Sequence, residues 1–172
     1  GNKTEEYDPA TDSWRYLKDM PTTRKGCGAA VLNDLMYVTG GQKAYGEPGQ
    51  PSMHRYNPTA DVWDSTSAAM PFEQYVMPVT ACGGKIYAGC SLYHPKDLAE
   101  YDPTANSWYV IANTPSLECT ALCGYDGILY AFGGAQDLNK VYSYDPSAKT
   151  WEPKTDMPSG RMGAVACLSN GL

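Results

Sequence analysis

Two arginines of this 172-residue chain are the side chains best suited to hold a ligand. Arg24 and Arg161 each stand three residues after the proline of a Met-Pro dipeptide. A planar guanidinium can bind a carboxylate through two parallel hydrogen bonds. The equivalent positions of the two arginines therefore predict a binding role, with a carboxylate of a partner as the simplest ligand.

The residue sets needed for catalysis are not evident in the sequence. The two histidines, His54 and His94, lie on separate segments, whereas a copper site needs His and Tyr ligands in one place. No Ser/His/Asp or Cys/His arrangement has a matching context, and the proximity of His94 to Cys90 is read as coincidence. We therefore expect no catalytic centre and no cofactor.

The cysteines do not have the spacing of a metal site. No Cys-x-x-Cys pair occurs, and neither histidine lies near a cysteine pair, which argues against zinc. Most cysteines stand among small apolar residues, so we expect buried free thiols in a reducing cytosol, with a disulfide framework as the alternative. The six are Cys27, Cys82, Cys90, Cys119, Cys123 and Cys167.

Charge and composition narrow the partner class. The net charge is −6 and no Lys/Arg cluster occurs, which argues against nucleic acid and anionic membranes as partners. No apolar run of 18 residues and no signal peptide are present, so we expect no membrane association and a cytoplasmic location, with the cytoskeleton or nucleus as alternatives. The 17 Gly, 13 Pro and 14 Tyr favour short strands joined by turns.

A repeat of about 45 residues organises the chain. Four Tyr-(Asp/Asn)-Pro triplets are each followed by a Trp seven residues after the Tyr, and the successive Trp lie 49, 45 and 43 residues apart. A repeat of this length predicts stacked units that bury their apolar faces against each other. The pairs are Tyr7 with Trp14, Tyr56 with Trp63, Tyr101 with Trp108, and Tyr144 with Trp151.

One repeat predicts four antiparallel strands. Residues 26–32 are small and apolar, as an innermost strand requires, and residues 35–39 form a second strand that ends at Gly40-Gly41. A double glycine allows positive φ and close approach of another strand. Strands at 53–56 and around Trp63 complete the unit, which has the design of a propeller blade. We expect each Trp to pack between adjacent blades and each Tyr-Asp-Pro to form a turn.

The other repeats divide the chain in the same way. We predict an all-β propeller segment with three complete four-stranded blades and two partial ones. Such a set cannot close a ring, so we expect part of a propeller of roughly 270 residues, with self-association as the alternative. The divisions are 1–22 (third and fourth strands of a partial blade), 23–71, 72–115 and 116–158 (complete blades), and 159–172 (the inner strand of the next blade).

This pattern resembles the kelch repeat over essentially the whole chain. The shared elements are the double Gly after a Tyr-containing strand, then Tyr-Asp-Pro, Trp and Met-Pro, with Arg in two units. Some units depart from it: Gly89 is followed by Cys90, and two units read Gln74-Tyr75-Val76 and Leu117-Glu118-Cys119 near the arginine position. These departures argue against assuming a strongly acidic ligand.

Two sets of loops are expected on one face, where a rigid scaffold would present variable residues to a protein or peptide partner. The loops of the first set join the second strand of a blade to its third strand (42–52, 91–97 and 135–139). The loops of the second set lead from the fourth strand of one blade into the next blade (20–25, 70–76, 114–119 and 157–161). The candidate contact residues are Arg24, Lys25, Tyr45, Glu47, Gln74, Tyr75, Tyr93, His94, Glu118, Gln136 and Arg161.

Segments such as Glu100-Tyr101-Asp102-Pro103 and Asp156-Met157-Pro158 look like the Kelch-like (BTB-Kelch) proteins. The resemblance implies a propeller that captures a substrate protein, while BTB and BACK segments elsewhere in the polypeptide recruit a cullin-3 ubiquitin ligase and could support a homodimer. Other kelch proteins imply two alternatives, an actin-binding cytoskeletal scaffold and, less expected, a sugar epimerase.

Overall fold

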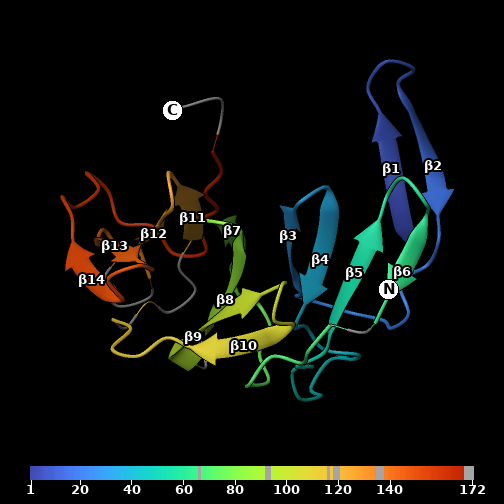
Figure 1. The fold of residues 1–172 in the computed structure, drawn as a ribbon. Helices are drawn as coiled ribbons and strands as arrows, with labels where there is room; N and C mark the ends of the chain where they lie inside the picture. Colours follow the sequence, from blue (N-terminus) through green and yellow to red (C-terminus); the bar gives the residue numbers. More distant parts are fainter. Residues whose placement is uncertain (66, 92–93, 116, 118–120, 135–137, 169–172) are drawn as a thin grey trace.

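The computed structural model describes residues 1–65, 67–91, 94–115, 117, 121–134 and 138–168. Every regular element within these residues is a β-strand. The strands form one two-stranded and three four-stranded antiparallel sheets, which follow one another from right to left in Figure 1. The predicted all-β fold of four-stranded units is confirmed. No helix in the described ranges is long and apolar enough to span a bilayer.

Each sheet is built from strands in sequence order. The two-stranded sheet contains β1 (Thr4–Asp8) and β2 (Ser13–Leu17). Blade A contains β3 (Gly28–Leu32), β4 (Leu35–Thr39), β5 (Met53–Asn57) and β6 (Val62–Asp64). Blade B contains β7 (Val79–Cys82), β8 (Lys85–Ser91), β9 (His94–Asp102) and β10 (Ser107–Val110). Blade C contains β11 (Ala121–Tyr125), β12 (Ile128–Phe132), β13 (Val141–Asp145) and β14 (Thr150–Pro153).

The seven-residue spacing places each Tyr directly opposite its Trp on neighbouring strands. Tyr56 pairs with Trp63 and Tyr101 with Trp108 in the β-ladders, and the same holds for the other two pairs. The four pairs of ring centroids lie 4.9–5.3 Å apart with tilted planes. Aromatic side chains in this geometry attract each other beyond their burial, so each pair closes the outer hairpin of its unit.

The turn between the paired strands is fixed by side-chain hydrogen bonds, as the Tyr-Asp-Pro motif predicts. Asp102 Oδ1 accepts bonds from the backbone N–H groups of Thr104 and Ala105, at 2.8 and 3.2 Å. These two bonds lower the pKa of the Asp102 carboxyl. Asn57 and Asp145 accept the same pair of bonds in their own turns. The last turn residue takes a left-handed conformation, with φ of 49° at Asp61 and 48° at Asn106.

That last turn residue also joins its blade to the preceding unit. Asn106 Oδ1 accepts a hydrogen bond from Tyr101 Oη at 2.9 Å and another from the backbone N–H of Ala68 at 2.8 Å. The Trp108 indole N–H donates to the carbonyl of the same Ala68 at 2.9 Å. The backbone N–H and carbonyl of Ala68 in blade A are thus both hydrogen-bonded by side chains of blade B, an arrangement we call the blade clasp.

A second blade clasp joins blade A to the two-stranded sheet. Asp61 Oδ1 accepts bonds from Tyr56 Oη and from the Lys18 backbone N–H, each at 2.8 Å, and Trp63 Nε1 donates to the Lys18 carbonyl at 2.8 Å. The Lys18 N–H and Tyr56 O–H hold the pKa of Asp61 below its usual value. Burial together with the bond to Asp61 raises the pKa of Tyr56 to about 12.

Blade C lacks the clasp. Lys149 occupies the turn position of Asp61 and Asn106, with φ of 56°, and it has no side-chain oxygen to offer. The Trp151 indole Nε1 is buried and has no hydrogen-bond partner in the described part of the chain. The contact of blade C with blade B includes the packing of Leu122, Leu129 and Tyr144 against apolar side chains of blade B.

Apolar side chains fill the spaces between neighbouring blades. Tyr37 and Met53 of blade A pack with Ile86 and Tyr101 of blade B in one buried cluster. In the other seam, blade B contributes Tyr87 and Leu98, and blade C contributes Leu122, Leu129 and Tyr144. Each of these side chains contributes about 1.5–3 kcal/mol when fully buried, so the seams between sheets constitute the core.

The predicted packing of each Trp between blades fails at Trp14. Its side chain is 68% exposed, although it pairs with Tyr7 like the other three. Trp63, Trp108 and Trp151 are partly buried.

Two further elements differ from the predictions. We expected a loop over residues 91–97, but β8 extends to Ser91 and β9 starts at His94. The pairing shifts register between Gly89 and Ser91, where Cys90 replaces a second glycine and takes φ of 58° in a β-bulge. The expected positive φ values do occur at Gly40 and Gly41.

The expected inner strand over residues 163–168 is not formed. No strand is assigned to these described residues, and residues 162–166 instead lie near β11, with which they line a pocket. A strand requires hydrogen bonds to a neighbour, and the hairpin partner predicted for this segment would begin only at Leu172, outside the described residues.

The Asn106→Ala variant should unfold about 1–3 kcal/mol more easily than wild type. The substitution leaves the Ala68 N–H and Tyr101 O–H without their acceptor, and Ala tolerates positive φ less well than Asn. Urea unfolding followed by tryptophan fluorescence measures the change. Asn106→Gly is the matched control, because it removes the side-chain oxygen but allows positive φ without strain. If this variant is as stable as wild type, the side-chain oxygen does not hold the blades together.

The Lys149→Asn variant should raise the free energy of unfolding by about 0.5–1.5 kcal/mol. Asn tolerates the left-handed conformation better than Lys, and its side-chain oxygen can accept a hydrogen bond as those of Asp61 and Asn106 do in their turns. Lys154→Asn, on the adjacent exposed segment, is a control that should change stability little. Equal stability of Lys149→Asn and wild type would contradict the role assigned to this turn position.

Candidate functional site

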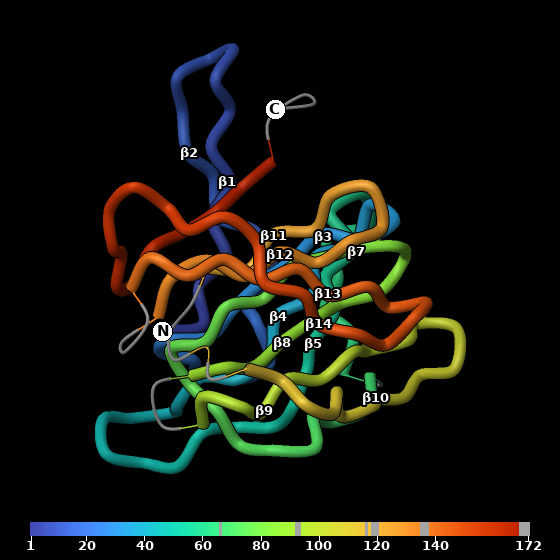
Figure 2. The backbone as a smooth tube through the Cα atoms, turned by 90° about the vertical axis from the view of Figure 1, so that its left-hand side faces the viewer, coloured from blue at the N-terminus to red at the C-terminus, as the bar shows by residue number. Residues whose placement is uncertain are grey.

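The two predicted sets of loops meet on one face, here called the loop face. Loop 42–52 and loop 20–25 are joined by reciprocal backbone hydrogen bonds between Lys25 and Gln42, each at 2.9 Å. Loop 70–76 joins them, because the Gly41 N–H donates to the Gln74 carbonyl at 2.9 Å. In Figure 2 the β4–β5 connection (teal) lies at the left, and the β9–β10 turn (yellow) lies on the opposite side. The hairpin turns are thus separated from the loop face.

Arg24 is part of the scaffold that holds this face together. Its side chain is only 5% exposed, and its guanidinium donates to the Gly40 carbonyl at 2.5 Å and to Ser52 Oγ at 2.7 Å. Burial lowers the pKa of Arg24. The planar guanidinium therefore binds loop 42–52 of its own blade, and it is not presented to a partner in this structure.

Arg161 lies differently from Arg24 despite the shared position after Met-Pro. Its side chain is exposed, and its backbone is hydrogen-bonded to Leu138 (N–H to carbonyl, 2.6 Å) and to Gly134 (carbonyl to N–H, 3.3 Å). A Cβ on Gly133 would come within 2.5 Å of the Arg161 carbonyl, which explains a glycine there. Arg161 is thus a surface cation on the rim of blade C.

An exposed aromatic side chain marks the tip of loop 42–52. Tyr45 is 89% exposed, and Lys25 Nζ lies 4.9 Å from the centre of its ring, within cation–π distance. Gln42 Nε2 donates to the Glu47 carbonyl, which braces the loop below Tyr45. The structure therefore brings three predicted residues, Lys25, Tyr45 and Glu47, onto one exposed loop pair.

A pocket of about 390 Å³ lies between blade A and blade B on the loop face. It contains three more of the predicted residues, together with four that the sequence did not single out. Of these four, Glu73 contributes a carboxylate and Ser91 a hydroxyl, and both lie in loop ranges that were predicted for this face. The lining residues are Pro48, Gly49, Glu73, Gln74, Tyr75, Ser91 and His94.

Gln74 is the buried centre of this pocket wall. It is 1% exposed; its Nε2 donates to the Asp97 carbonyl at 3.2 Å, and its Oε1 accepts from the Ser91 N–H at 3.4 Å. His94 Nδ1 lies 3.1 Å from Asp97 Oδ2. The remaining predicted contact residues, Tyr93, Glu118 and Gln136, lie outside the described residues.

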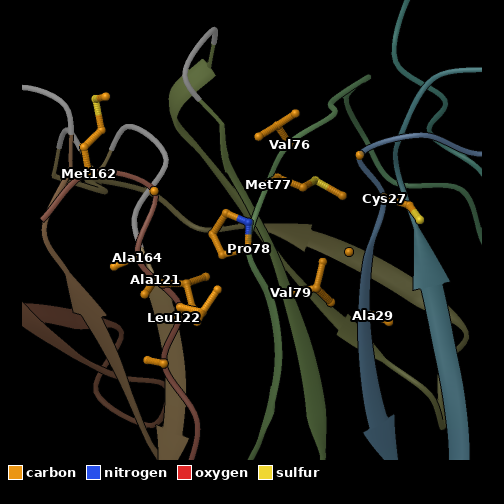
Figure 3. A pocket seen from close by; sticks show the side chains of 15 residues that line it. Cys27, Ala29, Val76, Met77, Pro78, Val79, Ala121, Leu122, Met162 and Ala164 are labelled. Atoms are coloured by element: carbon orange, nitrogen blue, oxygen red, sulfur yellow. The ribbon is translucent and has the colours of Figure 1, made fainter. Parts of the chain in front are cut away.

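A second, apolar pocket of about 580 Å³ lies where the first strands of the blades converge (Figure 3). Val76, Met77 and Val79 contribute side chains from the start of blade B, and Leu122 and Met162 face them from the opposite side. The strands are close here: a Cβ on Gly28 would come within 2.2 Å of a Val79 methyl group. Small residues on the inner strands are therefore a packing requirement.

The thiols do not form a reactive or metal-binding set. Cys82 and Cys90 are buried and Cys27 and Cys167 are exposed, so the predicted burial holds for part of the set; Cys119 lies outside the described residues. Burial raises the pKa of Cys82, Cys90 and Cys123. Within the described ranges, the cysteines are free and no group of three or more His, Cys, Asp or Glu could hold a metal ion.

Comparisons with known proteins identify the repeat. Residues 23–67 and 116–158 each match a family model described as a kelch motif. This is a kelch-repeat protein. Kelch-like protein 36 of Mus musculus is 26% identical over 184 residues, covering 97% of this chain and 30% of the relative. Kelch-like protein 23 of Homo sapiens is 28% identical over 179 residues, covering 98% and 31%.

The solved structure of YjhT matches the kelch chain with a TM-score of 0.73 over 92% of this chain and 60% of that one, at 18% identity. This match supports the fold alone. The chain spans only about 30% of the length of the Kelch-like relatives, so their remaining segments have no counterpart in it.

Substitution of Arg24 by Met should lower the free energy of unfolding by about 2–4 kcal/mol. The change keeps much of the side-chain volume but leaves the buried Gly40 carbonyl and Ser52 hydroxyl without their charged donor. Arg161→Met, which removes the exposed arginine, should change stability by about 0.5 kcal/mol or less. Chemical denaturation of both variants checks the difference, and similar values for the two would contradict the assigned positions.

Proposed function

We propose that the loop face binds a protein or peptide partner, and that the kelch chain is the recognition module of a longer polypeptide. The observation that carries the proposal is the convergence of loops from neighbouring blades around an accessible pocket and the exposed Tyr45. Aromatic and cationic side chains on a rigid rim are typical of protein interfaces. The described residues contribute binding groups to this face and no evident nucleophile–base pair.

The likeness to Kelch-like proteins extends the proposal to a ubiquitin-ligase substrate adaptor. In this role, BTB and BACK segments outside this chain would recruit cullin-3 and could form a homodimer, while the propeller would hold the substrate. A cytoplasmic location follows from this role. The alternative, an actin-binding scaffold, shares the fold and differs in the partner, so a direct binding assay distinguishes them.

A comparison of loop-face and turn-face variants tests partner binding. The Tyr45→Ala/Arg161→Ala double variant of the complete polypeptide should lose the partners recovered with wild type, because it removes an exposed aromatic and a cation from the rim. Tyr125→Ala, at the β11–β12 turn on the far side, should retain them. Affinity enrichment with mass spectrometry identifies the partners, and the purified partner should bind the double variant at least about 10-fold more weakly.

Two controls assign the class of partner. Cullin-3 should be recovered equally with wild type and the double variant, since the proposed contact lies outside this chain; loss of cullin-3 only with the double variant would place it on the loop face instead. Sedimentation with filamentous actin would favour the scaffold. An unchanged partner set in the double variant would contradict the proposed function.

A further inference from the structure

The pocket between blades A and B is formed by loops of the loop face that pack closely against each other. Its volume of about 390 Å³ falls within the range of about 300–1,000 Å³ usual for ligand pockets. Loop 42–52 forms one wall so close to loop 70–76 that a Cβ on Gly49 would come within 2.6 Å of the Gln74 backbone nitrogen. The shape of the pocket is therefore set by tight backbone packing.

The described residues that line this pocket include a carboxylate and no ammonium or guanidinium group. Glu73 lines the pocket, and the carboxylate of Asp97 lies 3.1 Å from His94 Nδ1. With a neutral His94 both carboxylates are uncompensated, and with a protonated His94 one negative charge remains. No Lys or Arg is among the described residues that line the pocket. A cation is therefore the ligand that the local field favours.

Ser91 gives a second and independent indication of a ligand. The residue lines the pocket and is 1% exposed, yet its Oγ has no hydrogen-bond partner in the part of the chain that the structure describes. A buried hydroxyl without a partner is unfavourable, and a ligand N–H that reaches it as the wall of the pocket shifts on binding would satisfy it. The backbone N–H of Ser91 is held by Gln74 Oε1, which fixes the position of the residue.

Arg24 does not reverse this preference. It is the buried arginine of the loop face, but its guanidinium already donates to the Gly40 carbonyl and to Ser52 Oγ. An acidic ligand would have to compete with these internal bonds and would face Glu73 in the pocket. A ligand that carries positive charge and donates hydrogen bonds meets neither obstacle.

We infer that this pocket binds a lysine or arginine side chain of the protein partner, with Glu73 as the counter-ion and Ser91 Oγ as a hydrogen-bond acceptor. The inference rests on the proposed function, because the basic side chain belongs to a segment docked on the loop face. Lysine and arginine carry only hydrogen-bond donors, which complements the acceptors of the pocket. The substrate class is thus a protein with a basic residue in its recognition segment.

Selection of peptides by the purified chain tests the inference. A random peptide library displayed on phage should yield peptides with Lys or Arg at one fixed position. Replacement of that residue by norleucine or citrulline should weaken binding about 5-fold in fluorescence polarisation, the value for a partly exposed ion pair. Glu73→Gln should abolish this difference. Glu47→Gln, on the same face outside the pocket, should preserve it.

Ser91→Ala separates a binding role from a structural one. The variant should bind the selected peptide more weakly while its free energy of unfolding stays equal to that of wild type or rises, because an unsatisfied hydroxyl is removed. Loss of stability together with unchanged affinity would assign Ser91 to the fold and overturn its place in the pocket.

The outcomes distinguish this inference from the proposed function. Selected peptides without a basic preference, or a preference that survives Glu73→Gln, overturn the pocket assignment and leave peptide binding by the loop face intact. A second outcome is that the peptides bind the Tyr45→Ala/Arg161→Ala variant and wild type equally, while Glu73→Gln removes the preference for a basic residue. This result would support the pocket assignment and contradict the wider interface that includes Tyr45 and Arg161. A library that yields no binding peptide overturns both.

Discussion

The indole N–H of one Trp and the side-chain oxygen of one turn residue together hold the backbone of the preceding unit. At Ala68 and at Lys18 both the N–H and the carbonyl are bound in this way. The Tyr of the motif supports the same turn oxygen through its hydroxyl. One seven-residue motif therefore pairs two strands and closes their turn, and in blades A and B it also docks the blade on its neighbour, so the positions of their loops depend on that docking.

The scaffold then determines which polar residues are free to act. Arg24 follows a Met-Pro dipeptide as Arg161 does, but loop 42–52 folds over it and takes its hydrogen bonds. Arg161 has no such cover and remains exposed. Arg24 and Arg161 thus occupy equivalent sequence positions, yet one guanidinium is buried within the fold and the other is exposed on the surface.

The chemistry of the loop face is therefore not the one that its arginines first suggest. With Arg24 engaged internally, the pocket between blades A and B is dominated by Glu73, the His94–Asp97 pair and the unsatisfied Ser91 hydroxyl. The Kelch-like relatives support a recognition role for the propeller, while the substitution of arginine in blade B gives this surface its own charge preference. Variation on a constant scaffold is how such modules acquire different partners.

The sequence by itself determined the repeat, the strand order, the hairpin pairs and the face on which the loops gather. These follow from local chemistry: a Tyr and a Trp seven residues apart must face each other across a short turn, and glycine is required where φ is positive. The tertiary structure decided the burial of Arg24, the bulge at Cys90, the absence of a strand at 163–168, and the meeting of Glu73, Ser91 and His94 in one pocket. Burial and proximity of this kind depend on residues distant in sequence, which a repeat pattern does not encode.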